Sequence, residues 1–349
     1  MRYTVHAVLL TQIDGVITPS LSVIDRPELV AGSVRVLVRA ASVNRADLLI
    51  RAGKYISAAG GGETPAVAGI DACGDVIEVA PDVSGIAVGD RVMAMVPGGL
   101  AEEVVVPAAA LVPVPRSWSY AEGAAAVVAL MTEHNALVTA GRLQPGESVL
   151  VHAAPAGVAT QAISLARVLG AGRVYGTARS GLHRESLLRH GIDELIDVTK
   201  TDFADRTDEL TGGRGIDVVL DHVGGPYLEQ NLRAAAIGGR IVGVGRLGGS
   251  NGSLDMEELA RKRVELIGVT FRTRTDTDKF DIARALRTVD LEGNADALRP
   301  VVHGIYPWHE VAEVQNQLAD NKHVGKLVLE VQRAVGHRDR TDSVPTARS

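Results

Sequence analysis

An apolar run followed by a turn of small residues is the strongest candidate for a binding site in this sequence. The run 148–153 is too short for a helix and does not alternate, so it predicts a strand buried on both faces. A turn and a helical segment follow. In that place a dinucleotide-binding domain receives a pyrophosphate on backbone N–H groups and on the amino end of the helix, and small side chains let the phosphates approach. An ordinary strand–turn–helix connection explains the turn about equally well. The candidate contacts are Ala156, Gly157, Val158 and Ala159.

The end of the next predicted strand, 173–177, favours a cofactor with a 2′-phosphate. An NAD site places Asp or Glu about 20 residues beyond the turn, against the ribose 2′-hydroxyl. No acidic residue stands there in this sequence. The alternative is a solvated basic helix start, which the helix dipole disfavours. We therefore predict NADPH rather than NADH. The residues available to it are Gly176 at the strand and then Arg179, Ser180, His183 and Arg184.

The surrounding pattern predicts two kinds of structure. The first ~120 residues contain short alternating strands separated by Gly and Pro, which suggests a small β-barrel. A helix is predicted over 122–140, and beyond it buried strands alternate with helical segments, as in a doubly wound α/β domain. Near residue 298 the chain returns to short strands that we expect to rejoin the first part. The predicted strands are 34–40, 74–79, 91–96, 148–153, 173–177, 216–221, 239–243, 264–269, 301–307 and 326–331.

Composition excludes several classes of protein. The 349 residues carry a net charge of −6 with scattered basic residues, so no surface for nucleic acid or anionic lipid is predicted. The single cysteine, Cys73, excludes an intramolecular disulfide framework and a cysteine-rich zinc lobe. The longest apolar run, 123–131, is far short of a membrane span, and no signal peptide is recognised. We expect a cytoplasmic enzyme with a disordered tail over 333–349.

Several motifs resemble the zinc-independent quinone-oxidoreductase and enoyl-reductase branch of the medium-chain dehydrogenase/reductases. The resemblance runs from about residue 43 to 329. It implies a GroES-like β-barrel catalytic domain (1–122 and 299–332), a doubly wound Rossmann domain (123–298), and an active site in the cleft between them. The motifs are Val43-Asn44-x-x-Asp47-x-x-x-Arg51-x-Gly53-x-Tyr55, Pro65-x-x-x-Gly69-x-Asp71-x-x-Gly74-x-Val76, Gly89-Asp90-Arg91-Val92, Asp221-x-Val223-Gly224-Gly225, Gly239-Arg240-x-Val242-x-x-Gly245 and Gly325-Lys326-x-Val328-Leu329.

The same resemblance argues against a catalytic zinc ion. Zinc alcohol dehydrogenases of this superfamily place Cys where this chain has Asn44 and His where it has Ile70. A zinc site needs Cys, His or carboxylate ligands that converge, and the histidines of this sequence share no ligand spacing. Without a Lewis acid, reduction of an already activated C=C bond or quinone is favoured over alcohol oxidation.

The resemblance also assigns catalytic and cofactor-binding residues. Tyr55 looks like the tyrosine that enoyl reductases offer as proton donor or carbonyl polariser; a loop tyrosine packed on the barrel is the alternative. Asn44 is expected to bind ribose or nicotinamide, although Asn is also a common turn residue. Thr132 is expected beside the nicotinamide. Glu133 and His134 are unusual neighbours there, and a solvated helix-face carboxylate is the simpler interpretation of Glu133. The other implied cofactor contacts are Val223, Val244, Gly245 and Lys326.

The leading hypothesis is NADPH-dependent reduction of a quinone or an α,β-unsaturated carbonyl compound. The nearest alternative is an enoyl reductase of an acyl thioester or a secondary-metabolite intermediate. A non-catalytic NADPH-binding sensor or scaffold is an alternative of another class, motivated by the alanines in the turn and by Glu133.

Arg246 either binds a substrate carboxylate or is a solvated loop arginine, the commoner case. The strand 264–269 looks like an edge that pairs in a homodimer.

Overall fold

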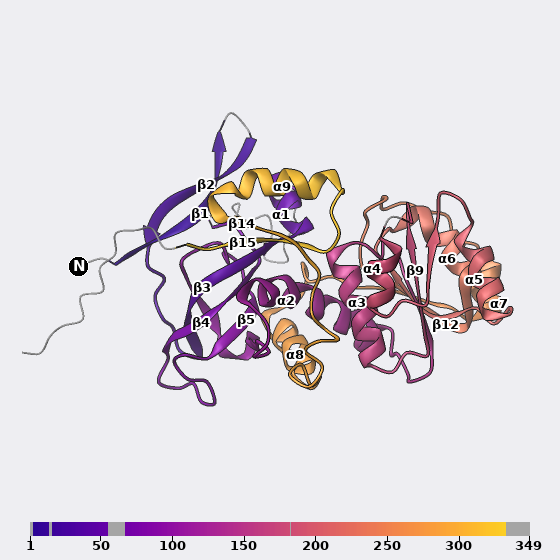
Figure 1. Cartoon of the computed structure of the whole chain (residues 1–349), viewed down its shortest axis with the longest axis horizontal. Helices are drawn as coiled ribbons and strands as arrows, with labels where there is room; N and C mark the ends of the chain where they lie inside the picture. Colours follow the sequence, from indigo (N-terminus) through magenta and orange to yellow (C-terminus); the bar gives the residue numbers. More distant parts are fainter. Residues whose placement is uncertain (1–2, 14–15, 55–66, 182, 333–349) are drawn as a thin grey trace, which may run out of the picture.

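A computed structural model shows the chain as two parts joined side by side along its long axis (Figure 1). The structure describes residues 3–13, 16–54, 67–181 and 183–332. Tyr55, the loop 56–64 and the tail predicted over 333–349 lie outside the described residues.

The first part is built on a sheet in the order β14-β15-β3-β4-β5-β7, with β6 also paired to β3. The predicted return of the chain is confirmed, because β15 pairs antiparallel with β3 from Leu327 opposite Val43 to Glu330 opposite Ala40. A hairpin of β1 and β2, which the sequence analysis did not anticipate, stands beside this sheet. The elements are β1 (Thr4–Ile13), β2 (Val16–Asp25), β3 (Ser33–Val43), α1 (Arg45–Arg51), β4 (Asp71–Val79), β5 (Arg91–Met95), β6 (Glu103–Pro107), β7 (Val112–Pro113), β14 (Val302–Pro307), α9 (Val311–Asp320) and β15 (Lys326–Glu330), with 3₁₀ turns Ala108–Ala110 and Trp308–Glu310.

The second part is a parallel sheet in the order β10-β9-β8-β11-β12-β13, which confirms the predicted doubly wound domain. The chain order reverses between β8 and β11, and ligands of such sheets bind at that switch point, beyond the carboxyl ends of the strands. Its elements are β8 (Ser148–Val151), α3 (Gly157–Val168), β9 (Arg173–Ala178), α4 (Arg184–Arg189), β10 (Glu194–Asp197), α5 (Phe203–Thr211), β11 (Ile216–Asp221), the 3₁₀ turn Gly225–Tyr227, α6 (Leu228–Ala234), β12 (Ala235–Gly243), α7 (Met256–Lys262) and β13 (Glu265–Gly268).

Strand β8 shows why the parallel sheet is apolar throughout. Val149 and Val151 pack into a core shared with α3, while Leu150 points to the opposite face and packs with residues of α5 and α6. Successive side chains of a strand point to opposite faces, so a strand covered on both sides has to be apolar at every position.

Helix α2 (Tyr120–His134) joins the two parts, and α8 (Asp276–Leu286) lies beside it (Figure 1). Ser119 and Glu122 form a capping box at its start. The helix packs on both β3 and α3, and a Cβ atom added at Gly123 would lie 2.5 Å from the Cys73 Sγ atom, so the helix approaches the barrel closely. The helix was predicted to run over 122–140. Its last part, Asn135–Ala140, is instead a π-helix, a form that often occurs at functional sites.

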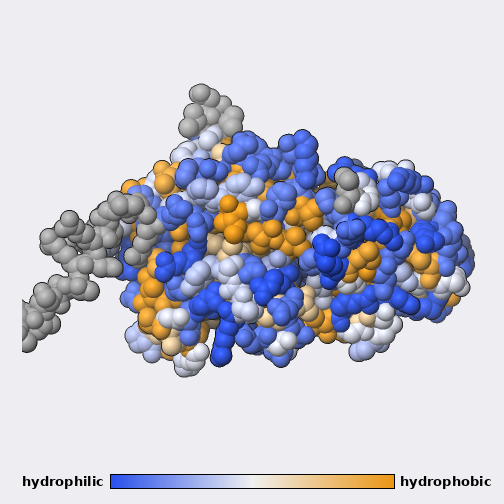
Figure 2. Space-filling model, viewed as in Figure 1, coloured by the Kyte–Doolittle hydropathy of each residue, from blue (hydrophilic) through white to orange (hydrophobic). Residues whose placement is uncertain are grey.

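Most of the face in Figure 2 is hydrophilic, with an apolar area below α9. Ile305, on the edge strand β14, is among the exposed large apolar residues.

Among the described residues, no helix has the length and hydropathy needed to cross a membrane. The proposed domain boundaries at residues 122/123 and 298/299 stay predictions.

Candidate functional site

The predicted phosphate-binding turn lies between β8 and α3, at the carboxyl edge of the parallel sheet. Ala153 has φ of +52°, in the left-handed region that non-glycine residues rarely adopt. Helix α3 then begins at Gly157 with no side-chain cap. The N–H groups of a first helical turn have no partner within the helix. This turn therefore offers the uncapped helix start that an anion can occupy.

The glycine in this turn is required by the neighbouring domain. A Cβ atom on Gly157 would lie 2.7 Å from the Gly325 carbonyl oxygen and 2.7 Å from the Lys326 side chain. The backbone N–H of Gly325 also donates to the Pro155 carbonyl at 3.0 Å. The start of β15 thus rests directly on the turn. The sequence analysis explained the small residues of this turn by the space that a phosphate needs. At position 157, the close contact with β15 is a second reason for a glycine.

The basic residues that follow β9 differ in whether they already have hydrogen-bond or ion-pair partners. Arg179 is exposed and has no hydrogen bond or ion pair among the described residues. Burial raises the pKa of Tyr227, and the positive charge of Arg179 opposes that shift. Arg184, by contrast, donates to Glu194 at 3.0 Å and to the Leu195 carbonyl at 3.2 Å. Arg179 is therefore available for a ligand, and Arg184 is already engaged.

A buried polar cluster on the barrel side holds Asn44 in one orientation. Its Oδ1 atom accepts from the Lys326 ammonium at 2.6 Å, and its Nδ2 atom donates to the Asp71 carboxylate at 2.7 Å. Ser42 donates to the same carboxylate through its hydroxyl at 2.6 Å. We call Ser42, Asn44, Asp47, Asp71 and Lys326 the barrel cluster. It brings two of the predicted site residues, Asn44 and Lys326, into direct contact.

Burial governs the ionisation of this cluster. It raises the pKa of Asp47 to about 7, against the hydrogen bond from the Asn44 N–H that lowers it. Burial likewise raises the pKa of Asp71, while the Lys326 charge opposes the shift. The pKa of Lys326 is lowered by burial and supported by both carboxylates. Asp71 and Lys326 thus stabilise each other's charge, whereas the Asp47 carboxylate is stabilised chiefly by the hydrogen bond from the Asn44 N–H.

The predicted nicotinamide contacts gather where β11 and β12 end. The backbone N–H groups of Val244 and Gly245 donate to the Asp221 carbonyl at 2.8 and 2.9 Å. The Asp221 carboxylate accepts from the N–H groups of Val223 and Gly224, both at 2.8 Å. One aspartate therefore organises both loops at this edge.

Glu133 is not a solvated carboxylate, so that interpretation is wrong. Its side chain is 0% exposed, and its Oε1 atom accepts from His222 Nε2 at 3.0 Å. The sequence could not show this, because residue 222 is 89 positions away. Thr132, the residue before it, is half-buried, and Arg246 is exposed; their predicted roles stay predictions.

A second buried chain of hydrogen bonds starts from His152, which follows β8 directly. His152 bonds through Nδ1 to the Thr177 hydroxyl at 2.9 Å and through Nε2 to Asn231 Oδ1 at 2.6 Å. Asn231 Nδ2 then donates to Asp221 at 3.0 Å. Burial lowers the pKa of His152 to about 4, so the ring is neutral at pH 7. The Asp221 carboxylate requires an amide donor, which fixes the asparagine and leaves the His152 proton on Nε2.

Sequence reasoning missed Arg45 and His323. Arg45 opens α1 directly after Asn44, and its half-buried guanidinium has no hydrogen bond or ion pair among the described residues. Burial lowers the pKa of His323, and the charge of Arg45 lowers it further. The Nδ1 atom of His323 is buried with no hydrogen-bond partner in the part of the chain that the structure describes, and His323 stands two residues before Gly325. Arg45 and His323 therefore both belong to the part that contains the barrel, and His323 precedes the contact of Gly325 with the turn. The signal was available, because a basic residue follows Asn44 directly.

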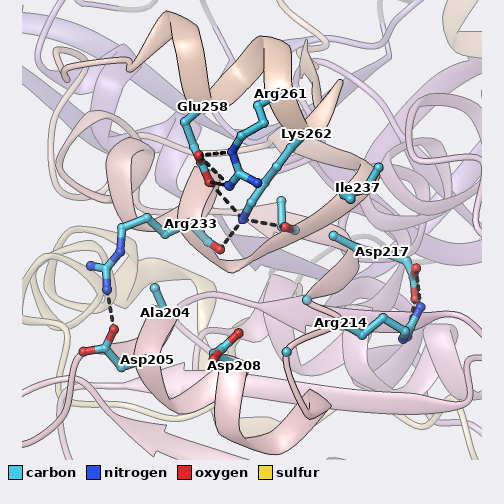
Figure 3. Close-up of a pocket in the computed structure, with 14 residues that line it drawn as sticks. Ala204, Asp205, Asp208, Arg214, Asp217, Arg233, Ile237, Glu258, Arg261 and Lys262 are labelled. Atoms are coloured by element: carbon cyan, nitrogen blue, oxygen red, sulfur yellow. Dashed lines mark hydrogen bonds and ion pairs between the residues drawn. The ribbon is translucent and has the colours of Figure 1, made fainter.

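A separate pocket of about 660 Å³ lies at the opposite edge of the parallel sheet, where β11 and β12 begin (Figure 3). None of the predicted site residues lines it. Its cations are already paired: Arg214 with Asp217 at 2.8 Å, Arg233 with Asp205, and Arg261 and Lys262 with Glu258 at 2.7 and 3.3 Å. We therefore place the candidate site at the carboxyl edge and not in this pocket.

Two family descriptions match the chain in the expected order. "Alcohol dehydrogenase GroES-like domain" matches residues 30–116, and "Zinc-binding dehydrogenase" matches residues 157–287. The chain is 30% identical to the "Quinone oxidoreductase-like protein 2 homolog" of Nematostella vectensis, over 85% of this chain and 81% of that protein. It is 35% identical to the "Spectinabilin polyketide synthase system protein NorB" of Streptomyces orinoci over 86% of this chain, but spans only 13% of that protein's length.

Solved structures give the same picture. The CurK enoyl reductase superposes with a TM-score of 0.81 at 27% identity, covering 94% of this chain and 99% of that one. Mycobacterial Rv1454c, whose structure is complexed with NADPH, superposes with a TM-score of 0.77 at 29% identity, covering 94% of this chain and 100% of that one.

Proposed function

This chain belongs to the medium-chain dehydrogenase/reductase superfamily of oxidoreductases, and from that premise we propose that it reduces a conjugated carbonyl compound with NADPH. The substrate class is a quinone or α,β-unsaturated carbonyl, or an enoyl thioester. The observation that carries the choice of NADPH is Arg179, which follows β9 directly, is exposed and has no partner among the described residues, at a place where an NAD site needs a carboxylate.

The residues of the cleft fit a dinucleotide. The uncapped start of α3 and the guanidinium of Arg45, which has no partner within the described ranges, suit a pyrophosphate, and Arg179 suits a 2′-phosphate. Thr132, Val244 and Gly245 would then border the nicotinamide. When bound, NADPH supplies the hydride. The protein orients the two reactants and excludes water, which accounts for much of the rate acceleration in such enzymes. Tyr55 or water is proposed to supply the proton.

We also propose that no catalytic zinc takes part. The side chain at the position of a zinc-binding cysteine is Asn44, and both of its polar atoms already have partners within the barrel cluster. The Lys326 ammonium lies 2.6 Å from the Asn44 oxygen, and a second cation there would be repelled. Within the part of the chain that the structure describes, no three His, Cys, Asp or Glu residues converge as metal ligands.

The quinone and enoyl thioester alternatives are supported about equally. The quinone oxidoreductase-like relative favours the first, and the polyketide synthase relative and the CurK enoyl reductase favour the second. A non-catalytic NADPH sensor is the remaining candidate, since Ala156 and Ala159 make the turn atypical.

Nucleotide binding followed by turnover tests the proposal. Purified protein is titrated with NADPH and NADH by nucleotide fluorescence, and NADPH oxidation is followed with a small quinone, an enone and an enoyl-CoA. We expect Arg179→Ala to weaken NADPH binding by about 10- to 100-fold and NADH binding by less than about threefold, because a charge-assisted phosphate contact contributes about 1.5–3 kcal/mol. Arg189→Ala, an exposed arginine of α4, is the matched control.

The outcomes separate the candidates. Turnover of the quinone or of the enoyl-CoA selects the substrate class. Tight NADPH binding without turnover of any of the three compounds selects the sensor. Equal losses of NADPH and NADH binding in Arg179→Ala contradict the 2′-phosphate assignment.

We further propose a homodimer formed through β13. This strand is the edge of the parallel sheet, paired only with β12 among the described residues, and Leu266 on it is 49% exposed. Pairing with a second copy would cover the open edge. Light scattering at micromolar concentration tests this, and a monomer would contradict it.

A further inference from the structure

Glu133 and His222 form a buried pair in which the carboxylate is less than fully satisfied. The two side chains are 0% and 6% exposed, and a single bond of 3.0 Å joins Glu133 Oε1 to His222 Nε2. Two buried atoms of the pair, the second oxygen Glu133 Oε2 and the other ring nitrogen His222 Nδ1, have no hydrogen-bond partner among the described residues. A buried carboxylate with one neutral partner is costly, so this environment favours a charged partner.

The pair connects the segments that border the proposed nicotinamide site. Glu133 follows Thr132 on α2, and His222 precedes Val223 at the end of β11. The His222 carbonyl accepts from the Leu247 N–H at 3.1 Å, and a Cβ atom on Gly245 would lie 2.5 Å from that same oxygen. Helix α2, the end of β11 and the loop after β12 therefore meet at His222.

The end of helix α2 requires a side-chain contact with the parallel sheet at this point. Its α-helical pattern stops at His134, and the backbone continues as a π-helix from Asn135. Beyond the pair, Asn135 accepts a bond of 3.3 Å from Arg274. Since the regular backbone hydrogen bonding changes directly after Glu133, the placement of Thr132 depends on side-chain contacts with the sheet.

Three groups act on the pKa of the His222 ring: Glu133 from α2, Asp221 at the end of β11, and His152, which follows β8 directly. Burial opposes a charge on the ring. The Glu133 carboxylate, the Asp221 charge and the His152 carbonyl outweigh burial, so the pKa of His222 lies above its ordinary value. His152 carries no charge at neutral pH, because burial lowers its pKa to about 4.

The geometry points to Glu133 and His222 as an ionised positioning pair, which holds Thr132 and the 222–224 and 245–247 loops around the nicotinamide for hydride transfer. This inference rests on the proposed function. The pair touches neither reactant, and it acts through the segments that it joins. As pH rises through the His222 pKa, the ring loses its proton and Glu133 is left as a buried charge without a counter-charge. The tie then weakens, and hydride transfer slows.

The test measures the hydride step and not only stability. NADPH oxidation is followed in single turnovers between pH 6 and 10, with whichever quinone or enoyl-CoA the wild type reduces. NADPH deuterated at the transferred position reports how far the hydride step limits the rate. The variants are Glu133→Gln, His222→Gln and the double substitution of both, and Glu257→Gln, an exposed glutamate on α7, is the control. Thermal unfolding and the Kd for NADPH are measured for each.

We expect the alkaline decline of the wild-type rate to move to lower pH in Glu133→Gln, because the ring loses its carboxylate partner. The rate at pH 8 should fall about tenfold, equal to about 1.4 kcal/mol, with a larger isotope effect. The Kd for NADPH should change by less than about threefold, since the phosphate contacts lie elsewhere. The double variant has two amides that can hydrogen-bond but do not titrate in this range, so it should lose the alkaline decline and keep more activity than either single variant.

Two results overturn the inference. One is an unchanged pH profile and isotope effect in folded Glu133→Gln, which would make the pair only structural. The other is an alkaline decline that persists in the double variant, which would assign it to another group and serves as the second criterion if a single variant does not fold. Wild-type protein that neither binds nor oxidises NADPH overturns the proposed function as well, and the wild type alone reveals that case.

Discussion

The barrel cluster and the pair formed by Glu133 and His222 are both buried, and they differ in how completely their polar atoms are satisfied. In the barrel cluster, both oxygens of Asp71 and both polar atoms of Asn44 have partners. In the cluster of Glu133 and His222, one buried carboxylate oxygen has none among the described residues. A fully satisfied network fixes one arrangement, whereas an incompletely satisfied one can change with protonation. The difference indicates a support around Asn44 and Asp71 that its hydrogen bonds fix in one arrangement, and a pair at Glu133 and His222 whose hydrogen bonding is incomplete.

The largest effect is expected from Lys326→Met. This change removes the ammonium that binds Asn44 and balances two buried carboxylates. The free energy of unfolding at pH 7 should fall by about 3–5 kcal/mol, and by less at pH 5, where the carboxylates accept protons more readily. Urea denaturation measures both values. Lys322→Met, at an 85% exposed side chain, is the control and should change stability by less than about 0.5 kcal/mol.

Glu133→Ala should have a smaller effect on stability, about 1–3 kcal/mol at pH 7. The His222 ring left behind can lose its proton and become neutral, whereas Lys326→Met leaves two buried carboxyl groups without their cation. The same urea measurement applies, with Glu257→Ala as control. A loss equal to or larger than that of Lys326→Met would contradict the contrast between the two clusters.

Asp47→Asn sharpens the comparison through pH. Burial raises the folded-state pKa of Asp47 to about 7, above the ordinary value of 3.8. Between these values the folded state binds more protons than the unfolded state, so this group's contribution to stability decreases as pH rises from about 4 to 7. The asparagine does not titrate. Wild type should therefore lose about 2–3 kcal/mol more than the variant between pH 5 and pH 8. Equal pH slopes in urea denaturation would show that Asp47 does not titrate in this range.

The smallest effect is expected from Thr177→Val, which removes the hydroxyl bonded to His152 Nδ1 at 2.9 Å and keeps the side-chain shape. The loss should be about 0.5–1.5 kcal/mol in urea denaturation, because one neutral hydrogen bond is lost. Thr139→Val, an exposed threonine of the π-helix, is the control. A loss above about 3 kcal/mol would mean that the whole chain from Thr177 to Asp221 depends on this bond.

The sequence allowed much of the fold to be predicted, because local pattern carries it. The buried run at 148–153 and the return of 326–331 to the barrel both follow from apolar periodicity and motif order. The hairpin of β1 and β2 was not anticipated. Its residues alternate weakly between buried and exposed, so the periodic signal is poor. The π-helix at Asn135–Ala140 was expected to continue the α-helix, because both forms share the same apolar composition.

The candidate site was predictable only in part. Arg179 could be identified because its position relative to the turn is fixed by the strand and helix between them. Arg45 was overlooked although it adjoins Asn44, since its lack of a partner among the described residues is visible only in three dimensions. Tyr55 lies outside the described residues, so its role as proton donor stays a prediction.

The sequence by itself determined the order of the two parts, the turn before α3 and the basic residue that follows β9, because these depend on residues close together in the chain. Only the tertiary structure decided the roles of Gly157, Glu133 and Lys326. Gly157 meets β15 across a separation of more than 160 residues, Glu133 meets His222, and Lys326 meets Asn44. Burial sets the charge state of these groups, and burial arises from the packing of distant segments, which local sequence does not encode.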